Sequence, residues 1–306
     1  MAAPPVTASP TPSPRPTPTG PPPYQWLSGL RYTGPRPVLA VKVDNVSQAR
    51  PQVGVDAADV VYVEQVEDGL TRLMAIFSSH VPSTVGPVRS ARTNDIELLR
   101  QYGKPVLAFS GANKGVADDV AHAFVIDASA NVLSSYFSRD NGREIPHNLF
   151  LAPVPLLLAH PSLPARDVGF RFGPARPGGG AATTVAATYP MSRFTFSYDR
   201  ASRRYLVSLD GTPDVMADGA RLGATNLILQ YVPIHNDKYV DVNGDVSPYS
   251  STVGRGTAWF YREGRATLVT WSRPTLLSPT RWLGPDGKDV TLRAGGQTWV
   301  MLVPKT

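Results

Sequence analysis

The sequence has no cysteine and no long hydrophobic run. The absence of cysteine from its 306 residues excludes disulfides, iron–sulfur clusters and thiol catalysis, and it leaves the redox environment open. The best apolar run, LLLA near residue 157, is far shorter than the roughly 18 residues needed to span a bilayer. The sequence therefore predicts no transmembrane helix.

Lysine is also scarce, and it occurs only at positions 42, 104, 114, 238, 288 and 305. The formal net charge of +6 therefore comes mainly from arginine, and a basic chain raises the question of nucleic acid. The basic residues are scattered singly among acids, without the stripe or the interleaved aromatic platform that binding to a phosphate backbone needs. We predict no nucleic-acid partner.

The first 23 residues consist almost entirely of Pro, Thr, Ser and Ala. This composition cannot bury a core and favours extended polyproline II, so we expect a disordered tether over 1–23. At about 3.1 Å per residue it could span on the order of 70 Å. Such tails commonly follow the lipid-modified cysteine of bacterial surface lipoproteins, in which case the full gene would encode an upstream signal sequence. The alternative is a Pro-rich linker of a cytoplasmic protein.

A stretch rich in Gly and small residues, 173–188, suggests a flexible linker between a domain at 24–172 and one at 189–306. In the leading domain, apolar runs predict strands at 37–43, 59–66, 70–79 and 105–110. Helical segments lie between some of these strands. We therefore expect an α+β (or mixed α/β) N-terminal domain with a mixed sheet.

Two helices are predicted in the leading domain. The first begins near Asn94 as the N-cap, with Glu97 completing a capping box, and ends at Gly103. The second covers about 114–123. After residue 188 the pattern changes to short apolar runs separated by Asp-Gly, Asn-Gly and Glu-Gly turns, which predicts a β-rich C-terminal domain.

A hairpin is predicted over 59–77, with a three-residue loop at 67–69 that ends in glycine. This loop sets Glu64 opposite Arg72, and period-two alternation places both on a face that is otherwise apolar. One interpretation is a buried structural ion pair. The other is the half-buried floor of a binding site.

Arg89 and Arg92 lie just before the predicted first helix, where unpaired backbone amides already carry partial positive charge. Two guanidinium groups at this point favour an incoming negative group, either a ligand or an internal carboxylate such as Glu64, Glu67 or Asp95. SGANKG at 110–115 could also cradle an anion, although a plain turn between strand and helix explains it better.

Asp44 and Asn45 follow the strand at 37–43, where polar side chains converge on ligands in α/β folds, although an ordinary Asx turn is the alternative. The loop at 138–150 carries His147 close to Glu144. His147 could fix the loop, contact a ligand or act as a general base. The remaining histidines show no metal-ligand spacing, and we predict no metal site and no cofactor.

The motifs VKVDN, VVYVEQVEDGLTRLMAIF, GPVRSAR, IPHNLF and GQTWVMLVP resemble those of the DUF3048 (YerB-like) bacterial lipoproteins. The resemblance extends from about residue 28 onward and implies an extracytoplasmic, often lipid-anchored protein with an N-terminal and a C-terminal domain. The resemblance implies no particular biochemical activity. The chain departs from the family by lacking the lipobox cysteine. The matching positions are Asp44, Asn45, Glu64, Glu67, Gly69, Arg72, Arg89, Ser90, Arg92, His147 and Asn148.

We therefore expect a non-catalytic protein at the cell surface, tethered to the outer face of the membrane or secreted. Its partner would be an anionic or glycan-containing cell-wall polymer, or an envelope protein. The expected ligand-binding residues are Asp44, Asn45, Glu64, Arg72, Arg89, Ser90, Arg92, His147 and Asn148. The alternative function is a wall-active hydrolase that uses Glu64 or Glu67 with His147.

Overall fold

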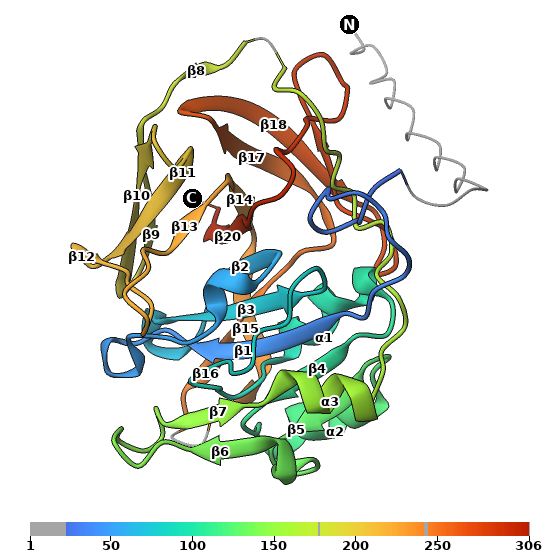
Figure 1. Ribbon diagram of the computed structural model, residues 1–306, viewed down its shortest axis with the longest axis vertical. Coiled ribbons are helices and arrows are strands. Elements are labelled where there is room, and N and C mark those ends of the chain that lie inside the picture. Colours follow the sequence, from blue (N-terminus) through green and yellow to red (C-terminus); the bar gives the residue numbers. More distant parts are fainter. Residues whose placement is uncertain (1–22, 177, 242–243, 306) are drawn as a thin grey trace, which may run out of the picture.

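The computed structural model describes residues 23–176, 178–241 and 244–305. Within these residues the protein is mostly β-sheet with few helices, and no helix is both long and apolar enough to cross a membrane. An 11-stranded mixed sheet runs through the molecule in the order β19-β18-β17-β14-β20-β2-β3-β1-β4-β5, with β8 paired to β18 (Figure 1). The expected mixed sheet is thus confirmed, while the α+β description is only loosely supported. The expected tether lies almost wholly outside the described residues.

The predicted strands of the leading segment all form. They are β1 (Leu39–Asp44), β2 (Val60–Gln65), β3 (Thr71–Phe77) and β4 (Val106–Phe109), followed by β5 (Ile126–Ser129), β6 (Phe137–Arg139) and β7 (Leu149–Leu151). The helices of this segment are α1 (Thr93–Leu99), α2 (Lys114–His122) and α3 (Pro153–Ala159).

The predicted β-rich character of the second segment is also found. Its strands are β8 (Gly180–Ala181), β9 (Thr184–Tyr189), β10 (Ser192–Asp199), β11 (Arg204–Leu209), β12 (Thr212–Pro213), β13 (Gly223–Ala224), β14 (Asn226–Val232), β15 (Ile234–Val240), β16 (Val246–Ser250), β17 (Gly254–Arg262), β18 (Arg265–Arg273), β19 (Arg281–Leu283) and β20 (Thr298–Pro304). Strands β9–β13 build a separate 5-stranded sheet.

The two segments share one sheet. Strand β20, near the C-terminus, lies between β14 and β2 and is parallel to both. Strands β8 and β9 lie largely within 173–188, where the sequence suggested a linker. The stretch forms β9 because Val185, Ala187 and Tyr189 alternate with exposed residues and bury one face of this strand. The domain boundaries themselves stay a prediction.

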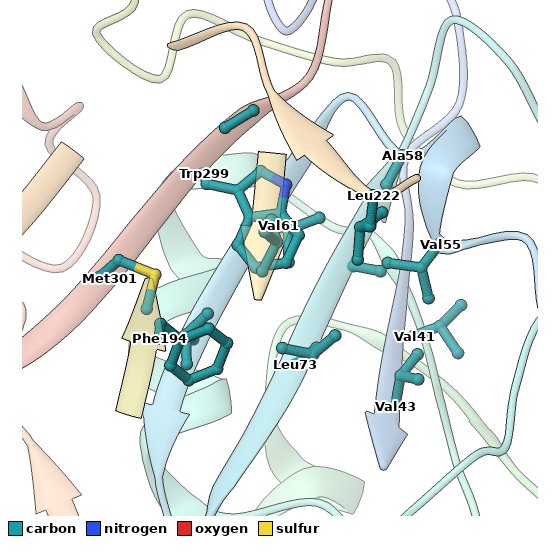
Figure 2. Close-up of a cluster of buried hydrophobic side chains, with 14 of the residues drawn as sticks. Val41, Val43, Val55, Ala58, Val61, Leu73, Phe194, Leu222, Trp299 and Met301 are labelled. Atoms are coloured by element: carbon teal, nitrogen blue, oxygen red, sulfur yellow. The ribbon is translucent and has the colours of Figure 1, made fainter. Parts of the chain in front are cut away.

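Alternation along the central strands gives the large sheet two apolar faces. One face carries Val41, Val61 and Leu73 and packs against the small sheet. Figure 2 shows Phe194 of the small sheet over these strands. Phe196, on the same strand β10, has its ring centroid 5.9 Å from that of Trp299 of β20. The opposite face carries Ala40, Tyr62 and Met74 and is covered in part by α1 and α2. The charged residues discussed below lie on this second face or at its edge.

Helix α1 begins two residues earlier than predicted, and its cap differs. Arg92 occupies the N-cap position, and its backbone N–H donates to Asp95 Oδ2 at 2.7 Å. The predicted capping box of Asn94 and Glu97 is therefore wrong, because Asp95 stands three residues after the true N-cap. Glu97 instead accepts hydrogen bonds from Tyr249 and Thr252. Helix α2 agrees with its prediction.

The hairpin β15–β16 packs across the leading segment as an arm (Figure 1). It contacts β2, α1 and the turn at Glu67–Gly69. Its side chains reach residues far away in sequence: Ser247 donates to Glu67, and Tyr249 donates to Glu97 at 2.6 Å. The arm thus closes one side of the charged region that the leading segment builds.

Candidate functional site

The predicted hairpin register is correct and gathers charge at one edge of the sheet. Glu64 lies opposite Arg72, and Arg72 also lies opposite Asp44 on β1. Because β1 and β2 run antiparallel to β3, the ends of β1 and β2 meet the start of β3 at this edge. The turn at Glu67–Gly69 closes as expected, and the N–H of Val66 donates to the carbonyl of Leu70 at 2.9 Å.

A backbone segment between Pro87 and Arg92 runs along this edge and places Arg89 and Arg92 beside the charged residues. The N–H of Asp44 donates to the carbonyl of Pro87 at 2.9 Å, and the N–H of Arg89 donates to the carbonyl of Lys42 at 2.8 Å. On its other side the N–H of Val88 donates to the carbonyl of Leu149 at 2.7 Å. The loop before β7, with His147, is thereby held beside the end of β1.

The innermost charges form a triad that the sequence analysis missed. Lys42 Nζ contacts Glu64 Oε2 and lies 2.6 Å from Asp95 Oδ1, and all three side chains are fully buried. Asn94 Nδ2 donates to Glu64 Oε2 at 3.0 Å. The interpretation of Glu64 as a member of a buried structural ion pair holds, although its partner is Lys42 rather than Arg72. The interpretation as a half-buried binding floor is wrong for Glu64, because its side chain is sealed from solvent.

The triad favours a protonated carboxyl group. Burial, and then the negative charge of Asp95, raise the pKa of Glu64 to about 8, although Lys42 acts in the opposite direction. Two buried carboxylates facing one ammonium group would leave an excess negative charge in a low dielectric. Glu64 therefore holds its proton near neutral pH.

A second pair joins Glu67 to Arg92. Arg92 Nε donates to Glu67 Oε1 at 2.6 Å, and its Nη2 donates to Oε2, which makes the pair bidentate. Ser247 Oγ of the arm also donates to Oε1. Burial alone would raise the pKa of Glu67, but the hydrogen bonds and charge of Arg92 hold it at about 2. Glu67 is thus ionised, and both of its oxygens are engaged.

The outermost carboxylate is Asp44, which holds the histidine loop. Its Oδ2 lies 2.7 Å from His147 Nδ1 and 2.9 Å from Arg89 Nε, and its Oδ1 accepts the N–H of Asn45 at 2.9 Å. Arg89 Nε is within ion-pair distance but has no hydrogen-bond geometry to a described acceptor. The side chains of Arg89 and His147 remain 24% and 16% exposed, and so they are the accessible members of the site.

Arg72 is the member without an ion-pair partner among the described residues. Its Nη1 donates to the carbonyl of Ser90 at 3.2 Å. Burial, followed by the positive charges of Arg92 and Arg89, lowers the pKa of Arg72 to about 10, although Glu67 and Asp44 act in the opposite direction. A carbonyl oxygen satisfies a donor but does not neutralise a charge, and so this guanidinium group lacks a full counter-charge.

The charge balance of the whole cluster also indicates that Arg72 lacks a full counter-charge. It comprises four cations and four acids: Lys42, Arg72, Arg89 and Arg92, with Asp44, Glu64, Glu67 and Asp95. With Glu64 protonated, the sum is one positive charge. Arg72 is the cation of this cluster without an ion pair among the described residues, and the positive charges of Arg92 and Arg89 act against its own charge.

The two predicted asparagines have structural partners. Asn45 donates to Thr71 Oγ1 at 2.9 Å and accepts from Gln52, and Asn148 accepts from Arg139 at 2.6 Å. Both are buried. Gly111, in the 110–115 loop, accepts the N–H of Ala91 through its carbonyl, which fits the plain turn.

The geometry does not support hydrolysis. Glu64 is sealed from solvent, and Glu67 is ionised and bound on both oxygens. Within the described residues His147 is bonded to Asp44, and no contact joins it to either glutamate. A general acid and base facing a shared substrate are therefore not formed by this set.

The comparisons with known proteins agree with the motifs. Residues 27–162 match the N-terminal domain, and residues 185–300 match the C-terminal domain, of the protein family of unknown function DUF3048. The chain belongs to this family. It is 27% identical over 300 residues to a Bacillus subtilis (strain 168) protein described as "Putative lipoprotein YerB", and the match covers 91% of this chain and 85% of that protein.

A solved structure shows that the fold is shared. The crystal structure of the YerB protein from Bacillus subtilis superposes with a TM-score of 0.78, covering 92% of this chain and 97% of that one at 23% identity. This DUF3048 fold is therefore an experimentally observed one. The family description gives no activity.

Proposed function

We propose that this DUF3048 protein is a non-catalytic lipoprotein at the outer face of the membrane, and that it binds an anionic group of the cell envelope at Arg72 and Arg89. The lipoprotein description of the Bacillus subtilis relative supports the location. The Pro-rich sequence of 1–23 fits a tether between an anchor and the folded part.

One observation carries the binding proposal, namely the uncompensated guanidinium group of Arg72. Burial and the like charges of Arg92 and Arg89 all disfavour the charged form of Arg72. An anion bound beside the guanidinium group would offset this cost. Arg89 lies beside it and provides access from solvent, since its side chain is 24% exposed, while its Nε stays 2.9 Å from Asp44 Oδ2. Carboxylate and phosphate groups suit guanidinium donors of this kind.

The partner that fits best is a phosphodiester polymer of the teichoic type. It offers repeated single charges, each able to pair with one guanidinium group. Peptidoglycan fragments carry carboxylates and are the second envelope candidate. An envelope protein with an acidic segment would use the same chemistry.

The test is isothermal calorimetry with poly(glycerol phosphate) oligomers and with soluble peptidoglycan fragments. We expect the Arg72→Met/Arg89→Gln variant to bind the preferred polymer on the order of a hundredfold more weakly or worse, because it removes two charge-assisted contacts of about 1.5–3 kcal/mol each. The matched control is Arg193→Gln/Arg255→Gln, which removes two exposed arginines elsewhere and should change the affinity less than twofold. If neither polymer binds the wild type, or if both double variants lose affinity equally, the proposal is wrong.

A further inference from the structure

A charged pocket lies in the C-terminal segment, away from the site described above. It has a volume of ≈580 Å³ and is lined by the β17–β18 turn, residues 175, 176, 178 and 179, and the turn 284–291. This volume falls within the range of about 300–1,000 Å³ that is typical of small-molecule sites. None of its lining residues belongs to the Arg72 cluster.

The β17–β18 hairpin places two like charges directly opposite each other. Arg262 and Arg265 are cross-strand partners on either side of a two-residue turn, Glu263 and Gly264, and both turn residues have positive φ. Like charges in this position destabilise a hairpin. A local conflict of this kind in an otherwise regular element is typical of a functional position.

Both guanidinium groups are held by carbonyl oxygens. Arg262 Nη1 donates to the carbonyls of Gly173 at 2.9 Å and Thr291 at 2.8 Å. Arg265 donates to the carbonyls of Gly178 at 3.1 Å and Gly179 at 2.5 Å. These bonds orient the two groups against the pocket wall. They leave the positive charges in place, since a carbonyl is neutral.

Arg262 also has an unused donor. Its side chain is 9% exposed, and its buried Nε has no hydrogen-bond partner among the described residues. A carboxylate oxygen of Glu263 lies 3.8 Å from its Nη2. That carboxylate is already paired with Arg203. A buried N–H without an acceptor beside a pocket costs free energy unless a ligand accepts it.

The remaining lining defines the shape and charge of the ligand. Phe260 and Val290 are 6% exposed and give the pocket an apolar wall. Lys288 adds a third cation, and no described residue forms an ion pair with its ammonium group. Asp286, the other acid of the lining, is paired with Arg176 at 2.7 Å.

We infer that this pocket binds a small acid of saccharide size, in which one carboxylate or phosphate faces Arg262, Arg265 and Lys288 and one ring face lies on Phe260 and Val290. The guanidinium donors fit an oxyanion, and the apolar wall suits the C–H face of a ring. This pocket shares no lining residue with the site of Arg72 and Arg89.

The experiment is calorimetric titration of the full chain with glucuronate, glucose 6-phosphate and glucose. We expect at least one of the two acids to bind, at least tenfold more tightly than glucose. A preference for glucuronate or for glucose 6-phosphate identifies the carboxylate or the phosphate as the natural group. Lys288→Glu and Arg265→Gln, both at exposed positions, should each weaken this binding on the order of tenfold, and Arg255→Glu on the same hairpin should change it less than twofold.

The inference is overturned if neither acid binds, if glucose binds as well as the acids, or if Arg255→Glu weakens binding as much as Lys288→Glu. Arg72→Met should leave this binding unchanged. Its loss in that variant would also overturn the assignment, because the ligand would then occupy the other site.

Discussion

Replacing Lys42 with methionine is expected to lower the free energy of unfolding by about 3–5 kcal/mol, the cost of breaking a buried ion pair by removing one partner. Lys42 is the cation between Glu64 and Asp95, and none of the three side chains contacts solvent. Methionine keeps most of the volume, so the loss reports charge rather than a cavity. Urea unfolding of the purified chain measures it.

Two further variants separate charge from packing in this experiment. Lys114→Met, at an exposed position on α2, should change stability by no more than about 0.5 kcal/mol. Lys42→Met/Glu64→Met should be more stable than Lys42→Met alone, because Asp95 keeps its bond to the Arg92 backbone. A loss below about 1 kcal/mol for Lys42→Met, or an additive double variant, would show that the triad is not a coupled unit.

Because Glu64 is protonated in the folded chain, we expect the free energy of unfolding to fall by about 2 kcal/mol between pH 6 and pH 8. Its pKa rises from 4.5 to about 8 on folding, and so the folded chain binds more protons than the unfolded chain in this range. The contribution of Glu64 to stability is therefore fully present below the unfolded pKa and is lost as the pH rises through the folded value. Urea unfolding at several pH values measures the slope.

Glu64→Gln should remove most of that slope, because glutamine does not titrate. Asp214→Asn is the matched control. Burial raises the pKa of Asp214 to about 6, and so this variant should flatten the profile below pH 6 and leave the decline above it. Glu67, with a pKa of about 2, stabilises the folded chain at constant strength above about pH 5, and its contribution is lost only as the pH falls into the acid range. An unchanged slope in Glu64→Gln would mean that Glu64 is ionised in the folded protein.

The local parts of the fold could be predicted from the sequence. The three-residue loop ending in Gly69 and the alternation of β2 and β3 place Glu64 opposite Arg72 correctly. The same alternation applied to β1 puts Lys42 on the face of Asp44 and Ala40. Part of the signal for the triad is therefore present in the sequence, but no local pattern indicates that β1 and β2 flank β3 on its two sides.

No pattern in the sequence indicates which distant strands pair with each other. Strands β2 and β20 are both nearly continuous apolar runs, which indicates burial on two faces but does not name a partner. Their parallel pairing merges segments that the sequence pattern separated into two domains. Ser247 likewise reaches Glu67 across 180 positions, through an arm whose sequence is mixed and polar.

The helix start was mispredicted for a specific reason. Asn94 is a common N-cap residue, but here its side chain binds Glu64, and Asp95 closes the first turn from the backbone of Arg92. A tertiary contact thus took the side chain that the local pattern assigned to the cap. The same region shows why the site is less open in the fold than the sequence suggested. All four of its acids pair with cations from other elements.

We propose that Arg72 is held without a full counter-charge and binds an anion from outside. The most direct test is the free energy of unfolding of Arg72→Met in a buffer free of phosphate and carboxylate. We predict no loss, or a gain of up to about 1 kcal/mol, because methionine fills the space and relieves the repulsion from Arg89 and Arg92. A loss of about 3 kcal/mol or more, as expected when a buried ion pair is broken, would show that the protein itself neutralises Arg72 and would contradict the account.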